Sequence, residues 1–235
     1  MLKGAFIVAL ITGYALISHF ALILPDGRTI AAALAVGVPA AALVWFITHW
    51  VFKFLSQPDL PCGQKSLRFT LAIALALATV LAPLWWAWPL VLANADTLYF
   101  AQHLGTNALL TWVFGHTLVA GSTPLVVTFA RMVHRDLPPE IAAYARQVTV
   151  AWTGFFLVTC ALSIILYTAA PLAVWSAFGV LLQWPSVIVF FVGEYLLRRM
   201  LFKDFDHASM QQGFEAYQSH QASPSAAAAI TPLKP

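Results

Sequence analysis

The chain has 235 residues, of which 61% are hydrophobic and only 9% are charged, and its mean hydropathy is +0.81. Soluble globular domains carry about 25% charged residues, so this composition excludes a soluble domain. It predicts an integral membrane protein.

The predicted elements follow from the spacing of the charged residues along the chain. They leave five long uncharged gaps of 22, 24, 27, 34 and 47 residues. Because a helix needs roughly 20 apolar residues to cross about 30 Å of hydrocarbon, the first four gaps each hold one span and the last holds two. We therefore predict an all-α bundle of six transmembrane helices, at residues 4–24, 29–52, 68–90, 97–119, 146–169 and 172–197. Small residues in the second span, such as Ala31 and Ala35, would allow close helix packing.

The basic residues predict the orientation of this bundle. Of the 12 lysines and arginines, 11 fall in connections on one side, and only Arg28 falls on the other. Basic residues accumulate on the cytoplasmic side of membrane proteins, so we expect both termini in the cytoplasm. The net charge of +3 then reflects topology and attraction to lipid headgroups, and no nucleic acid is expected as a partner.

The longest connection, between the fourth and fifth predicted spans, begins with an amphipathic segment at residues 123–135. Leu125, Val126, Phe129, Met132 and Val133 recur at helical spacing. The segment is expected to lie on the inner membrane surface, with its apolar face in the acyl chains. It is interpreted either as a surface linker or as a docking face for an anionic partner.

Acidic, basic and aromatic polar residues are predicted to converge on the cytoplasmic side. Prolines and Glu140 begin a helix after the amphipathic segment, and Glu194 stands four residues before Arg198 on the last span. Such a group is suited to a phosphate or carboxylate headgroup, or to purely structural pairing. The candidate patch for an anionic partner or headgroup comprises Arg131, Arg135, Glu140, Tyr144, Arg146, Glu194, Arg198 and Arg199.

Several of these residues also carry a resemblance to a known family. The motifs are Phe114-Gly115-His116-Thr117-Leu118, Leu137-Pro138-Pro139-Glu140 with Tyr144, Arg146, Val148, Thr149 and Trp152, and Phe191-Val192-Gly193-Glu194-Tyr195 with Arg198 and Arg199. Over residues 100–203 the chain resembles an uncharacterised family of bacterial six-helix inner-membrane proteins. Its members are often encoded beside acyl carrier proteins and ketosynthases of fatty-acid-like or aryl-polyene-like pathways. The resemblance implies a setting in the bacterial inner membrane, and it implies no catalytic residue. One departure from the expected pattern is that the second residue after Gly115 is Thr117 where an arginine is expected, and His116 takes the basic position.

A second group of polar residues lies within the fourth predicted span and its end. Such residues most often hydrogen-bond to neighbouring helices, and the alternative is a substrate path. The strip comprises Gln102, His103, Asn107, Thr111 and His116. His103 and His116 are 13 residues apart, a spacing that permits haem ligation but places the two rings about 140° apart around the helix.

Motifs of membrane enzymes are not found in the sequence, which has neither repeated His-x-x-His boxes nor a Gly-x-Ser-x-Gly elbow. We expect no catalytic residue, no metal site and no cofactor, and the pattern favours a role without chemistry. Residues 207–235 are rich in Gln, Ser, Ala and Pro and are predicted to form a mostly disordered cytoplasmic tail.

These observations lead to three functional hypotheses. The first is an accessory or scaffold protein of acyl-carrier-dependent lipid or polyene-lipid biosynthesis, with membrane lipids and an acyl carrier protein or another pathway enzyme as partners. The second is a lipid or small-metabolite transporter that uses the polar strip and Glu194. The third is a b-type haem electron carrier.

Overall fold

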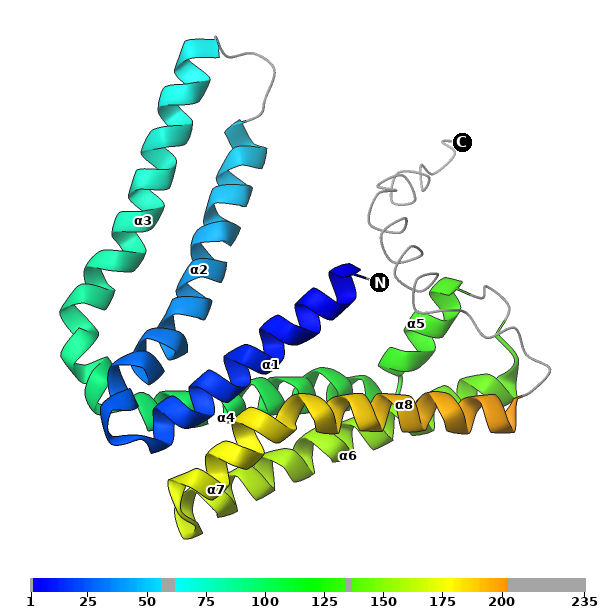
Figure 1. The fold of residues 1–235 in the computed structure, drawn as a ribbon. Coiled ribbons are helices and arrows are strands. Elements are labelled where there is room, and N and C mark those ends of the chain that lie inside the picture. The colour runs from blue at the N-terminus through cyan, green and yellow to red at the C-terminus, as the bar shows by residue number, and fades with distance from the viewer. Residues whose placement is uncertain (1, 56–61, 134–136, 203–235) are drawn as a thin grey trace, which may run out of the picture. The chain divides into compact units, whose positions relative to one another are not determined.

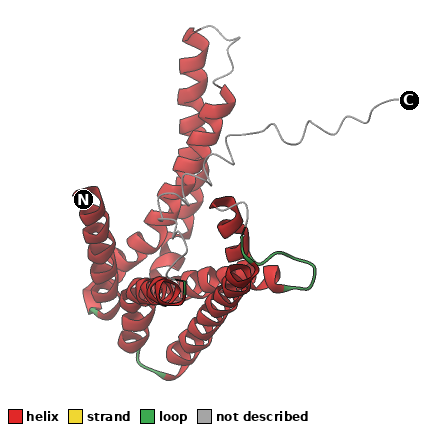
Figure 2. Ribbon diagram, turned by 90° about the vertical axis from the view of Figure 1, so that its right-hand side faces the viewer, coloured by secondary structure: helices red, strands yellow, loops and turns green. Residues whose placement is uncertain are grey.

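The computed structural model describes residues 2–55, 62–133 and 137–202 (Figure 1). Within these ranges the regular elements are helices joined by short loops, as Figure 2 shows. The helices are α1 (Leu2–Ile23), α2 (Arg28–Leu55), α3 (Cys62–Ala93), α4 (Ala95–Gly115), α5 (Leu125–Val133), α6 (Pro139–Ala169), α7 (Leu172–Ser176) and α8 (Gln183–Leu201). Single turns form η1 (Pro25–Gly27), η2 (His116–Leu118) and the π-helical η3 (Ala177–Leu182).

The all-α membrane fold predicted from the sequence is confirmed. Among the described residues, four segments are long and apolar enough to cross a membrane: residues 25–50, 73–93, 139–169 and 172–201. They match the second, third, fifth and sixth predicted spans, and the last of them is built from α7, η3 and α8 in succession. The first and fourth predicted spans fall on α1 and α4. The amphipathic segment forms α5, and the predicted tail lies outside the described residues.

The helices belong to two compact units. Unit 1 contains α1, α2, α3, the beginning of α4 up to His103, the end of α6 from Ile165, and α7 with η3. Unit 2 contains the rest of α4, α5, the larger part of α6, and α8 from Trp184.

Small residues let the helices of unit 1 approach one another closely. Ala31, Ala32 and Ala35 on α2 are fully buried and belong to one cluster with Tyr99 of α4 and Trp175 of α7. An alanine presents little more than backbone, so large aromatic side chains of neighbouring helices pack directly on α2. In a bilayer, where lipid is as apolar as leucine, this close van der Waals packing is a main source of helix association.

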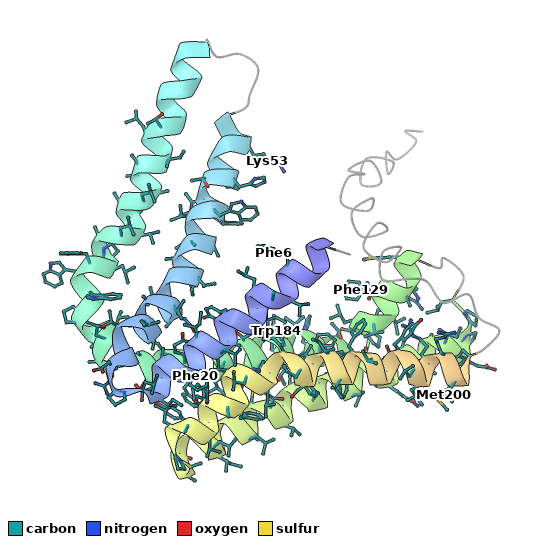
Figure 3. All side chains as sticks on the ribbon, in the orientation of Figure 1. Phe6, Phe20, Lys53, Phe129, Trp184 and Met200 are labelled. Carbon is teal, nitrogen blue, oxygen red and sulfur yellow. The ribbon has the colours of Figure 1, made fainter. Side chains whose placement is uncertain are left out.

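Large apolar side chains cover the outside of the helices. Figure 3 shows Phe6, Phe20, Trp184 and Met200 among them, and Trp86 on α3 is 90% exposed. Monomeric soluble proteins rarely expose extensive apolar surface, whereas lipid-facing helices must. The exposed aromatic and aliphatic side chains therefore have the distribution of a membrane-embedded protein.

Aromatic packing holds the helices of unit 2 together. The Trp152 ring of α6 lies 4.6 Å, centroid to centroid, from Phe190 of α8 and 6.1 Å from Phe114 of α4. Phe155 and Phe156 extend the cluster along α6. One face of α6 therefore joins both neighbouring helices and keeps them in register.

A tight turn joins α1 to α2 and depends on a glycine. Gly27 in η1 is buried, and a Cβ added to it would overlap the backbone carbonyl of Ala21. Backbone cannot move aside as a flexible side chain can. Only glycine is therefore compatible with this turn.

Substituting Gly27 by alanine is expected to destabilise the protein by about 1–3 kcal/mol through overpacking. The matched control is Gly13→Ala inside α1, where an added Cβ meets no atom within 4 Å and alanine is the better helix former. Thermal unfolding in detergent should show a lower Tm for Gly27→Ala and an unchanged or higher Tm for Gly13→Ala. Equal Tm values for the two variants would contradict this description of the turn.

Candidate functional site

The last turns of α8 in unit 2 gather two cations, a carboxylate and an aromatic ring. Arg198 Nε lies 3.3 Å from Glu194 Oε1, an ion pair without hydrogen-bond geometry, and the two side chains are 33% and 16% exposed. The guanidinium carbons of Arg198 and Arg199 each lie 5.8 Å from the centroid of the Tyr195 ring. This distance is within the range of a cation–π interaction. Tyr195 thus lies against both arginine side chains.

Tyr144 connects this group to α6. Its hydroxyl donates to the backbone carbonyl of Glu194 at 3.5 Å, and its ring meets the edge of Phe202 with centroids 5.3 Å apart. Of the eight residues in the predicted patch, the structure therefore brings together four: Tyr144, Glu194, Arg198 and Arg199.

The other residues of the predicted patch are not part of this group on α8. Arg131 on α5, Glu140 in the first turn of α6 and Arg146 further along α6 are all exposed. In the described part of unit 2, none of these three is joined to the α8 residues by an ion pair or hydrogen bond. Arg135 lies outside the described residues.

Two threonine hydroxyls hold the N-terminus of α5. The Leu125 N–H donates to Thr117 Oγ1 at 3.0 Å, and the Val126 N–H donates to Thr149 Oγ1 at 3.3 Å. The first N–H groups of a helix have no partner within the helix, so these hydroxyls act as caps, supplied by η2 and by α6. α5 is therefore fixed to the rest of unit 2 at its beginning.

This attachment decides which face of α5 turns inward. Val127, which the helical periodicity had not assigned to the apolar face, is buried, whereas Phe129 is 46% exposed (Figure 3). Arg131 follows Val127 by one helical turn and remains exposed. The tertiary hydrogen bonds set the rotation of the helix, and Phe129 is left on its exposed face.

The predicted polar strip of α4 is divided between the units. Gln102 and His103 belong to unit 1, and Asn107, Thr111 and His116 to unit 2. Asn107 is only 2% exposed, and Thr111 Oγ1 donates to its carbonyl at 2.8 Å. His116 is exposed, with Nδ1 2.9 Å from the Trp112 carbonyl and its ring stacked on that indole.

Gln102 completes the hydrogen bonding of a proline-containing helix. Pro39 in α2 has no N–H, so the Ala35 carbonyl four residues earlier lacks its helical donor. Gln102 Nε2 donates to this Ala35 oxygen at 2.8 Å. In hydrocarbon, where no water replaces the lost bond, such a donor from a neighbouring helix is the expected solution.

His103 holds the end of η3 in unit 1. Its Nε2 lies 2.8 Å from Gln183 Oε1, and because that oxygen only accepts, Nε2 carries the proton. The imidazole also meets Trp175 and Phe178 edge to face, at centroid distances of 6.2 and 5.9 Å. Gly179 fits between them, since a Cβ there would lie 3.1 Å from the Trp175 indole.

A second histidine holds the beginning of η3. His19 Nδ1 on α1 lies 2.9 Å from Ser176 Oγ, and this hydroxyl donates to the Ala173 carbonyl at 3.1 Å. A hydroxyl has one proton, so the imidazole is the donor in the bond to Ser176. The π-helical turn is thus bounded at both ends by bonds to histidines of other helices. π-Helical turns are frequent at functional sites.

Sequence reasoning missed most members of this buried network. Tyr99 donates to Ser18 Oγ at 3.0 Å, and the partners are 81 residues apart; Ser176 and His19 are 157 apart. No local periodicity connects such distant residues. The only available signal was that each is a polar residue in a long uncharged gap.

Among the described residues, no three His, Cys, Asp or Glu side chains gather in a way that would hold a metal ion. His19 and His103 each use one ring nitrogen in the hydrogen bonds to Ser176 and Gln183.

No family model, curated protein or solved structure matches the chain. The functional proposal therefore depends on the geometry of the polar side chains within each unit and on the sequence motifs.

The hydrogen bond from Gln102 to the Ala35 carbonyl predicts an energetic coupling between Gln102 and Pro39. Gln102→Leu should destabilise the protein by about 1–3 kcal/mol, because it leaves a buried carbonyl without a donor. In a Pro39→Ala background the new N–H at position 39 supplies that donor within α2, so the same substitution should cost clearly less. A double-mutant cycle measured by unfolding in mixed detergent gives the coupling. Additive effects of the two substitutions would show that Gln102 does not compensate for Pro39.

Proposed function

We propose that the protein is an integral inner-membrane accessory or scaffold protein of acyl-carrier-dependent lipid or polyene-lipid biosynthesis. Its basic face, built from Arg131, Arg135, Arg146, Arg198 and Arg199, recruits an acidic carrier protein from the cytoplasm or holds an anionic lipid. The setting rests on the resemblance of residues 100–203, and the orientation rests on the location of 11 of 12 basic residues on one side.

The observation that carries the proposal is the presentation of Arg131. This side chain is exposed on a helix whose first turn is held by two hydroxyl caps, and it has no carboxylate partner within the described residues. A guanidinium with no counter-ion among the described residues can attract an external anion. Because α5 is anchored at its N-terminus, the Arg131 side chain starts from a defined position and not from a freely moving loop.

Electrostatic attraction to an acidic protein accounts for recruitment at this face. Complementary charges raise the association rate and fix the register of the partner, and their effect falls with ionic strength. Arg146 is also exposed, on the helix that caps α5 through Thr149. The proposal therefore requires binding that weakens steadily as salt is added.

Reversing the charge at Arg131 and Arg135 should reduce the affinity for an acyl carrier protein by about tenfold or more and flatten its salt dependence. Binding is measured by interferometry with the purified protein in nanodiscs at several salt concentrations. The matched control is Arg28→Glu, which removes the one basic residue predicted on the opposite side. If Arg131→Glu/Arg135→Glu binds the carrier as tightly as the native protein does, recruitment at this face is wrong.

A lipid or small-metabolite transporter is the second candidate, favoured by the burial of Asn107 in a lipid-facing helix. Under this alternative, reconstituted vesicles should move a fluorescent phospholipid between leaflets, and Asn107→Leu and Glu194→Gln should each slow the movement severalfold. Carrier docking does not involve Asn107. A variant that loses lipid movement and keeps carrier binding would favour transport over docking.

A further inference from the structure

A pair of arginines at the end of α8 has the surroundings of a lipid site. Arg198 and Arg199 stand three and four residues after Tyr195, so all three side chains lie on neighbouring positions of one helical face. Each guanidinium carbon is 5.8 Å from the same phenol ring. Both cations therefore lie beside the same aromatic ring.

The charges of this group do not cancel. Glu194 pairs with Arg198, with Nε and Oε1 3.3 Å apart. Arg199 is exposed and contacts the neutral ring of Tyr195, and in the described part of unit 2 no carboxylate pairs with it. One positive charge is therefore left over, which suits a singly charged phosphodiester.

Apolar side chains surround the same two arginines. The residues beside them on the final turns of α8 are at least 50% exposed: Leu196, Leu197, Met200 and Leu201 (Figure 3). An arginine among lipid-facing leucines extends its guanidinium toward the headgroups while its stem remains in the apolar layer. Tyrosine is typical of the same depth.

An occupant of this place needs an anionic group for the arginines and hydrocarbon for the leucines. Free phosphate would leave the apolar side chains uncovered, and an acidic protein would bring charged side chains against them. A phospholipid satisfies both requirements, since the planar guanidinium binds a phosphate through two parallel N–H groups.

We infer that Arg198, Arg199 and Tyr195 at the end of α8 form a binding site for the headgroup of an anionic phospholipid. This deepens the proposed function and rests on its orientation, because it divides the basic face between two tasks. Arg131 of α5, with Arg135 and Arg146, recruits the carrier protein, and the α8 arginines hold a lipid of the inner leaflet.

The test is competition between two lipids for the purified full-length protein. The protein is incubated in detergent with equal amounts of phosphatidylglycerol and phosphatidylcholine of identical chains, and retained lipids are counted by native mass spectrometry. The native protein should retain phosphatidylglycerol preferentially, and Arg198→Gln/Arg199→Gln should reduce this preference about tenfold or more. Arg28→Gln and Arg131→Gln are the controls and should keep it. An unchanged preference in the double variant would overturn the inference.

Two further variants separate the site from a general effect on folding. Tyr195→Phe keeps the ring and should keep the preference, whereas Tyr195→Leu removes the contact to both guanidinium groups and should lower it severalfold. Equal preferences for these two variants would contradict the role of Tyr195 in the site.

Excess glycerol 3-phosphate distinguishes a lipid from a free phosphate. It should leave the bound phosphatidylglycerol in place, and complete displacement would show that the acyl chains contribute nothing, which overturns the assignment to lipid. Carrier binding is measured on the same variants. If Arg198→Gln/Arg199→Gln loses carrier affinity and keeps the lipid preference, the pair belongs to the docking face and the lipid site is wrong. If only Arg131→Glu/Arg135→Glu loses carrier affinity, the lipid site stands.

Discussion

The structure depends on one constraint of the bilayer, which is that no water is present to replace a missing hydrogen bond. Helices satisfy almost all of their backbone groups internally, and the described elements are accordingly helical. The backbone groups that lack a partner within their own helix are satisfied by individual side chains. Gln102 supplies the donor that Pro39 lacks for the Ala35 carbonyl, and two threonine hydroxyls cap the first turn of α5. Polar side chains inside this protein therefore serve first to complete the backbone, and the histidine bonds at both ends of η3 extend the same principle to a helix that departs from α geometry.

The same constraint explains why the interior of unit 1 is made of small residues and a few large rings. Ala31, Ala32 and Ala35 let the aromatic side chains of other helices rest on α2, and Trp175 is completely enclosed. Without a hydrophobic driving force between helices in lipid, packing must be close to be stabilising. Gly179 shows how close this packing is, because an added Cβ would lie 3.1 Å from the Trp175 indole, closer than ordinary van der Waals contact. Specificity of helix arrangement comes from steric fit together with a small number of hydrogen bonds.

At the ends of unit 2 the polar groups have a different task. Here Glu194, Arg198 and Arg199 gather on the last turns of α8, and Tyr144 and Tyr195 lie against them. Each tyrosine presents an apolar body and a polar tip, as residues at a membrane–water boundary do. Glu194 pairs with Arg198, and no carboxylate in the described part of unit 2 pairs with Arg199. Such an arrangement separates two kinds of cation: those on α8, set among exposed leucines, and Arg131, set on a capped surface helix. The division supports two different partners for one basic face.

How much of this was contained in the sequence can be seen from particular residues. The uncharged gaps determined that the protein is helical and membrane-embedded, because the length of an apolar stretch and the thickness of the hydrocarbon are both fixed quantities. The i, i+4 spacing of Glu194 and Arg198 likewise predicted their ion pair. The rotation of α5, which buries Val127, and the partners of Gln102, His19 and His103 were decided only by the tertiary structure. Those contacts join residues tens to more than a hundred positions apart, and a local pattern specifies which residues can face a neighbour but not which neighbour they meet.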